Sequence, residues 1–198
     1  MKRTTSGESA GFFSRPTITE LKPLPTPREH IHNEKIEKVV GSTRSGEPIY
    51  TSKSFVVVGN APAFVTLPHK PLLNSISADS DMIVVVAHGG LKLFIYKSFN
   101  FGAGLTETAF DLPSVALETA LLSNEGQRTL IVAGDHMLQT VLVPMRPWAE
   151  IKAANVRQTE GAFSNIVYDN SNKCCHVIYK SGEWLQVLAD GQIVEPSA

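Results

Sequence analysis

The side chains best suited to acid–base or metal chemistry are six histidines, and they are scattered along the chain. A metal or acid–base site needs several such groups to converge with carboxylates or thiols. His30 and His32 lie in a polar segment without apolar periodicity, whereas His88 and His136 follow strand-like runs at expected hairpin turns. We therefore predict no metal site and no catalytic site from the histidines.

Cys174, Cys175 and His176 form the densest group of soft metal ligands in the sequence. Three consecutive residues of a strand cannot all face one ion, because neighbouring side chains point to opposite faces. A disulfide between adjacent strand residues would also require a distorted backbone. The sequence predicts two reduced thiols without a metal or cofactor, which is typical of a cytoplasmic or nuclear protein. The alternative is the mitochondrial matrix, since residues 1–15 faintly resemble a presequence interrupted by Glu8 and Gly11.

Other motifs give no catalytic assignment either. The glycine-containing segments 59–62 and 100–104 lack the Gly-Lys-Ser/Thr arrangement of a phosphate-binding loop, and no Gly-x-Ser-x-Gly sequence is present. The alternative to a non-catalytic protein is an enzyme whose site assembles from separate loops. Its candidate residues are His69, His88, Asp135 and His136.

Composition limits the classes of partner. The 198 residues carry a formal net charge of −1, so no excess of Lys and Arg is available to neutralise phosphates, and we do not expect nucleic-acid binding. The longest apolar stretches, such as 82–87 and 129–133, are far shorter than the roughly 20 residues of a membrane helix. We expect one packed domain and no membrane span.

Residues 1–35 are expected to form a disordered, proline-containing tail, because they have too few apolar residues to offset the entropy of ordering. Its candidate partner-binding residues are Pro23, Pro25, Pro27 and Arg28, in a segment that favours an extended polyproline-type backbone. Trp148, flanked by Arg146 and Pro147, is a further candidate for the surface, whereas Trp184 is expected to pack in the core.

An internal repeat organises the remainder, residues 36–198. Segments that begin at Ile76, Leu122 and Tyr168, 46 residues apart, share one order of features. Each contains an apolar residue, a polar turn, an apolar strand, a small or glycine-containing turn and a second strand. A looser fourth copy is the hairpin 39–50, because Val39 and Val40 lie 46 residues before Val85 and Val86.

Repeated hairpins of this length resemble the blades of the WD-repeat and related β-propeller families. The residues that carry the resemblance are Ser77-Ala78-Asp79 with His88-Gly89-Gly90, and Ser123-Asn124-Glu125-Gly126 with Gly134-Asp135. No Trp-Asp pair closes any unit, which departs from the family pattern. The resemblance implies a mainly β, degenerate propeller of about four units.

A second fold remains open, an α+β arrangement of hairpin-plus-helix repeats. Residues 114–122 contain many helix formers, but Val115, Leu117, Thr119 and Leu121 alternate as in a strand, which we favour. For 147–154 the sequence does not decide between helix and strand.

The expected function is that of a non-catalytic protein-interaction or assembly subunit, which binds a protein partner that completes the sheet or ring. The alternatives are the loop-assembled enzyme and an α+β accessory subunit.

Overall fold

The computed structural model describes residues 17–21, 38–42, 46, 48–51, 55–58, 64–66, 76–79, 82–97, 105–124, 126–145 and 150–195. These residues form strands and turns, and no helix occurs among them. The mainly β prediction is confirmed, and the α+β alternative is not supported. Residues 116–122 belong to a strand as favoured, and residues 152–154 of the undecided segment also belong to a strand.

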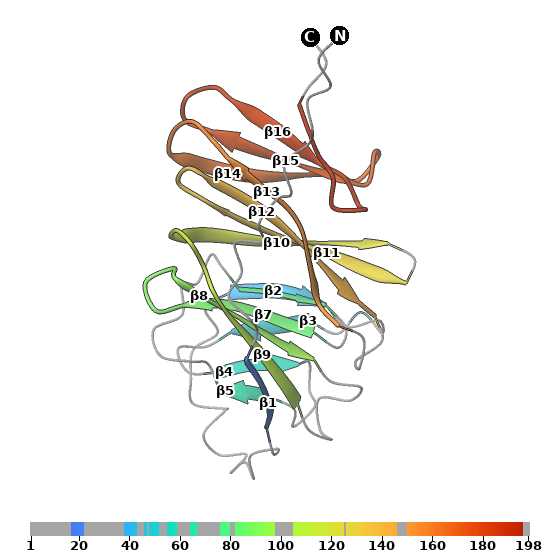
Figure 1. Cartoon of the computed structure of the whole chain (residues 1–198). Coiled ribbons are helices and arrows are strands. Elements are labelled where there is room, and N and C mark those ends of the chain that lie inside the picture. The colour runs from blue at the N-terminus through green and yellow to red at the C-terminus, as the bar shows by residue number, and fades with distance from the viewer. Residues whose placement is uncertain are drawn as a thin grey trace, which may run out of the picture.

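Four antiparallel sheets follow one another along the chain (Figure 1), each a meander of neighbouring strands. Sheet 1 contains β2 (Lys38–Ser42), β3 (Pro48–Thr51), β4 (Phe55–Val58) and β5 (Phe64–Thr66). Sheet 2 contains β6 (Ile76–Asp79), β7 (Met82–Ala87), β8 (Lys92–Lys97) and β9 (Leu105–Asp111), with β1 (Thr17–Leu21) added beside β9.

Sheet 3 contains β10 (Ala116–Asn124), β11 (Gln127–Gly134), β12 (Met137–Pro144) and β13 (Lys152–Gln158). Sheet 4 contains β14 (Phe163–Asp169), β15 (Cys174–Tyr179), β16 (Trp184–Val187) and β17 (Ile193–Val194). Turns within the described part join β7 to β8, β11 to β12 and β14 to β15. His88 and His136 adopt φ angles of 54° and 61° in two of these turns, which identifies them as turn residues.

The sheets pack face to face in the order 1, 2, 3, 4, and one apolar cluster fills each of the three interfaces. Sheets 1 and 2 enclose Ile49, Ile83 and Val85, and sheets 2 and 3 enclose Val84, Leu130 and Val132. The third cluster lies between sheets 3 and 4 and includes Ile131, Cys175 and Val177. Strand β7 is buried on both faces because it has a neighbouring sheet on each side.

The 46-residue spacing correctly predicts that Val85, Ile131 and Val177 lie on equivalent strands. In sheet 3 it is wrong by one residue, because Ile131 faces the opposite side of its sheet. Val85, Ile131 and Val177 are all fully buried and lie on the second strand of sheets 2, 3 and 4. Val85 and Val177 face the preceding sheet, whereas Ile131 faces the following one. Since a slip of one residue exchanges the two faces of a strand, Leu130 and Val132 are the counterparts in sheet 3.

The fourth copy of the repeat was aligned with the wrong strand. Val39 lies on β2 and pairs with Tyr50, so it belongs to the first strand of its sheet, whereas Val85 belongs to the second strand. The hairpin itself is present, and Gly46 between its two strands has a positive φ of 83°.

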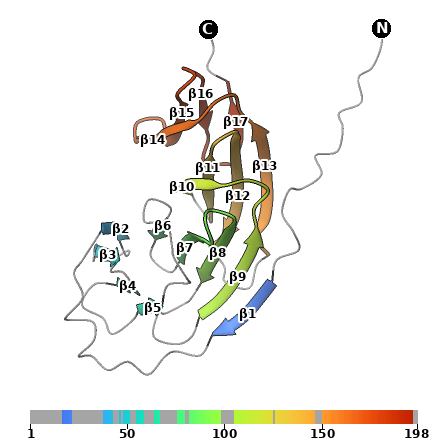
Figure 2. The same ribbon diagram turned by 90° about the vertical axis from the view of Figure 1, so that its left-hand side faces the viewer.

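Part of the expected tail is ordered. Thr17–Leu21 forms β1 and pairs antiparallel with Leu105–Ala109 of β9, which extends sheet 2 by a fifth strand (Figure 2). The composition of residues 17–21 did not predict this strand, because backbone pairing to an open sheet edge does not require apolar periodicity. These five residues lie within the segment 1–35 that is expected to be disordered, and the rest of that segment lies outside the described part.

Candidate functional site

The outer face of sheet 4 carries apolar side chains that no other sheet covers among the described residues. Val167 of β14, Ile178 of β15 and Trp184 of β16 lie on it beside His176. Trp184 is 39% exposed and Val167 is 42% exposed, and the four side chains line a groove of about 360 Å³. Trp184 was expected in the core, and the alternation of β16 instead directs it outward.

Alternation along the strands explains why this surface exists. Cys175, Val177 and Tyr179 face sheet 3 and are buried, whereas His176 and Ile178 between them face outward and are partly exposed. Sheet 4 therefore has apolar residues on both faces, as a sheet between two neighbours does. Among the described residues, only its inner face is covered by another sheet.

A polar cluster adjoins the groove on the same outer face. The Sγ atom of Cys174 lies 3.9 Å from Nε2 of His176, and this nitrogen lies 3.7 Å from Oδ2 of Asp169. The three ligand atoms all lie within 4.8 Å of one another. Nε2 of Gln186 donates a hydrogen bond to Sγ of Cys174 at 3.1 Å. We refer to Asp169, Cys174 and His176 as the outer-face cluster.

The carboxylate of Asp169 is fixed by its own turn. The Asn172 side chain donates to Oδ2 at 2.7 Å, and the backbone N–H groups of Ser171 and Asn172 donate to Oδ1. These hydrogen bonds, chiefly those from Asn172, lower the pKa of Asp169 and keep it ionised. On the opposite face of β15, burial raises the pKa of the Cys175 thiol to about 12.

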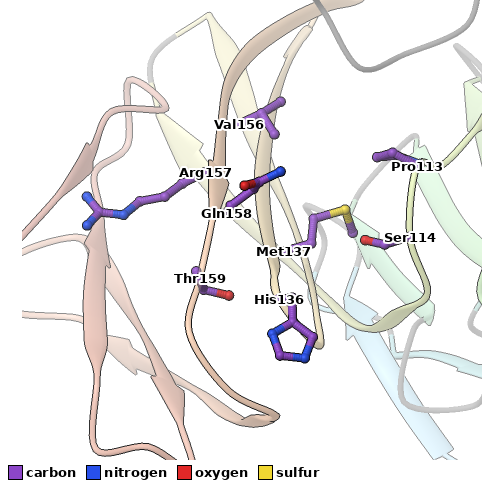
Figure 3. Close-up of a pocket in the computed structure, with 8 residues that line it drawn as sticks. All are labelled: Pro113, Ser114, His136, Met137, Val156, Arg157, Gln158 and Thr159. Carbon is purple, nitrogen blue, oxygen red and sulfur yellow. The ribbon is translucent and has the colours of Figure 1, made fainter.

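A second hollow of about 410 Å³ lies at one rim of sheet 3 (Figure 3). Its lining includes Ser114 before β10, His136 in the β11–β12 turn and Gln158 at the end of β13. Figure 3 shows Arg157 extending away from the other labelled side chains, and its Nη2 contacts Oε1 of Glu195. Among its described lining residues His136 is the single histidine, and none is a carboxylate or a cysteine.

The loop-assembled enzyme site gains no support. His88 and His136 occupy separate turns, and Oδ1 of Asp135 accepts a hydrogen bond from the Phe163 N–H at 2.7 Å. His69 lies outside the described residues, as do His30 and His32. The described part of the chain holds one group of three metal-ligating side chains, which is the outer-face cluster.

The partner-binding candidates Pro23, Pro25, Pro27, Arg28 and Trp148 all lie outside the described residues. The sequence pattern did not predict the outer-face cluster, because three consecutive strand residues, Cys174 to His176, cannot all bind one ion. Alternation excludes Cys175 but places Cys174 and His176 on one face. Asp169 joins them only through its pairing with Cys174 across β14 and β15.

The arrangement of the four sheets is similar to that of a solved structure. The WD40 domain of SCAP from fission yeast matches 95% of this chain with a TM-score of 0.54 and 12% sequence identity. This chain has a WD40-like β-propeller fold. The four sheets correspond to blades, and the chain spans 49% of the length of that WD40 domain.

No protein-family model matches the sequence, and no curated protein matches it. The likeness to the WD40 domain therefore rests on the arrangement of the blades and not on shared sequence motifs. Within the described ranges, the propeller also lacks any helix with the length and apolar character needed to cross a bilayer.

Proposed function

We propose that the protein is a non-catalytic interaction or assembly subunit and that a β-sheet of a partner protein packs on the outer face of sheet 4. The observation that carries this proposal is the apolar groove of Val167, Ile178 and Trp184 at the end of the stack. Exposed apolar surface at such a position is typical of a protein–protein contact.

The way in which the four sheets pack supports a sheet as the occupant. At each of the three internal interfaces, an apolar sheet face is covered by the face of a neighbouring sheet. The chain spans about half the length of the WD40 domain that it resembles, so a matching sheet at this end would continue the propeller. An aromatic residue at the centre of the groove, Trp184, has the character of an interface anchor.

Two further elements belong to this proposal. Pro23, Pro25, Pro27, Arg28 and Trp148 are proposed as additional partner contacts. The cytoplasm or nucleus is the proposed location, with the mitochondrial matrix as the alternative, and the free thiols of Cys174 and Cys175 favour a reducing compartment.

The proposal is tested with the variants Val167→Lys and Trp184→Lys of the full chain. Leu91→Lys is the matched control, because Leu91 is also exposed but lies in the β7–β8 turn of sheet 2. Wild type and each variant are used for affinity purification, and chemical cross-links from Lys173 and Lys180, which flank β15, are mapped onto the recovered proteins.

We expect a partner that is recovered with wild type and Leu91→Lys, is lost with both sheet 4 variants and is cross-linked through its β-strands. If the partner is a second copy, the same variants abolish self-association. Equal recovery of every bound protein by all four chains would contradict docking on sheet 4.

A further inference from the structure

We infer that Asp169, Cys174 and His176 form a binding site for a divalent transition-metal ion, with Zn²⁺ as the best chemical match. The three side chains supply one carboxylate oxygen, one thiol sulfur and one imidazole nitrogen, which are the three donor types of protein zinc sites. They come from two paired strands of a rigid sheet, so their backbone positions are fixed by β14 and β15.

The separations between the donor atoms fit a common ion. Zinc–ligand bonds of about 2.0–2.3 Å in a tetrahedron place neighbouring donor atoms about 3.4–3.6 Å apart. Here Nε2 of His176 is 3.9 Å from Sγ of Cys174 and 3.7 Å from Oδ2 of Asp169. These two separations need to shorten by a few tenths of an ångström. The third pair, Sγ of Cys174 and Oδ2 of Asp169, lies within 4.8 Å and must approach by up to about 1.2 Å through χ rotation to complete a tetrahedral set.

The same geometry disfavours a catalytic Cys-His-Asp arrangement. In such a triad the carboxylate holds one ring nitrogen of histidine, and the nucleophile contacts the other. Here Sγ of Cys174 and Oδ2 of Asp169 approach the same atom, Nε2 of His176. Nδ1 is buried and has no hydrogen-bond partner in the described part of the chain. A cation bound between the three side chains would replace the proton that Nε2 shares with Sγ of Cys174 and Oδ2 of Asp169.

Hydrogen bonds orient two of the three ligands. The Asn172 side chain donates to Oδ2 of Asp169, and the backbone N–H of Ser171 donates to Oδ1. Gln186 donates to Sγ of Cys174 and fixes the position of the sulfur on the outer face.

The ion enters from the outer face of sheet 4. Cys174 is buried, but the side chains of His176 and Asp169 are each 26% exposed and provide access. Binding forms the metal–sulfur bond as the Cys174 thiol releases its proton to solvent. With three protein ligands, the fourth tetrahedral position is left for water. This inference does not depend on partner docking, because all three ligands belong to this chain.

The test uses the full chain, reduced with a phosphine and freed of metal by a chelator, and titrated with Co²⁺ as a spectroscopic substitute for Zn²⁺. We expect an ultraviolet thiolate-to-cobalt charge-transfer band and intense visible bands of a four-coordinate ion, both abolished by Zn²⁺. Cys174→Ser removes the charge-transfer band, and Asp169→Asn and His176→Gln each weaken binding at least about tenfold.

Cys175→Ala is the matched control, since the Cys175 thiol faces sheet 3 and should leave the band unchanged. Gln186→Leu tests the supporting hydrogen bond and is expected to weaken cobalt binding about 10- to 100-fold. Circular dichroism of each variant verifies the β fold. The inference is overturned if Co²⁺ gives no thiolate band with the wild-type chain, or if the band survives in Cys174→Ser and is lost in Cys175→Ala.

Discussion

At the scale of single residues, Arg128 shows how the structure accommodates a charge in its interior. Its side chain is fully buried, and its Nε donates to Oδ2 of Asp79 at 2.7 Å across the boundary between sheets 2 and 3. Ser123 donates to the same oxygen at 2.9 Å. Asp79 is the last residue of β6. It is in addition the counter-ion of a charge on the neighbouring sheet, which sequence spacing does not reveal.

We therefore predict that Asp79→Ala lowers the free energy of unfolding by about 3 kcal/mol, because the buried guanidinium of Arg128 loses the carboxylate that accepts a hydrogen bond from its Nε. Urea denaturation measures the change. Asp111→Ala is the control: its carboxylate is 3.9 Å from Nζ of Lys92 on the surface, where an ion pair contributes less than about 1 kcal/mol. Equal losses in both variants would show that the burial of Arg128 is not the cause.

At the scale of the elements, the end of β11 depends on close backbone approach. A Cβ atom added to Gly134 would lie 2.0 Å from the carbonyl oxygen of Val115, just before β10. The β10–β11 pairing also contains a register shift between Ala116 and Glu118, so this end of the hairpin is bent. The turn that follows, Asp135-His136, is held to sheet 4 through the Phe163 N–H.

Gly134→Ala is expected to destabilise the protein by about 1–3 kcal/mol, since the added methyl group must displace backbone and not a flexible side chain. Thermal unfolding followed by circular dichroism measures the loss. Gly126→Asn is the control, because Gly126 has open space around it and asparagine tolerates its positive φ. A wild-type melting temperature for Gly134→Ala would refute the close approach.

At the scale of the whole molecule, stability depends on the faces that the sheets present to each other. Tyr179 is central to the interface of sheets 3 and 4: its hydroxyl donates to the carbonyl of Met137 at 3.1 Å, and its ring packs edge-on against Phe163. Burial of the side chain raises the pKa of Tyr179 to about 12. Burial likewise raises the pKa of Tyr96, between sheets 1 and 2.

The pH dependence of stability follows from these pKa values. The unfolded chain releases the Tyr179 proton near the ordinary value of 10.0, whereas the folded chain retains it to about 12. The stabilisation is therefore complete below pH 10 and is lost as the pH rises toward 12. We predict that urea midpoints fall over this window and that Tyr179→Phe falls less steeply. Identical slopes for the two chains would contradict the assignment.

How much could be predicted differs between the fold and the site. Alternating apolar runs and turn residues predicted the hairpins of sheets 2, 3 and 4, because strand formation depends on local side-chain pattern. The same pattern misassigned Ile131 to the wrong face and Val39 to the wrong strand, since register is fixed by pairing and not by spacing.

The sequence by itself determined the mainly β class, the repeated two-stranded units, the turn positions of His88 and His136, and a net charge of −1. These properties depend on local pattern and composition. Only the tertiary structure decided that β1 extends sheet 2, that Trp184 faces outward, and that Asp169 meets Cys174 and His176. Each of these depends on which strands pair and which faces are covered. The number of residues between two contacting side chains does not indicate that they meet in the fold.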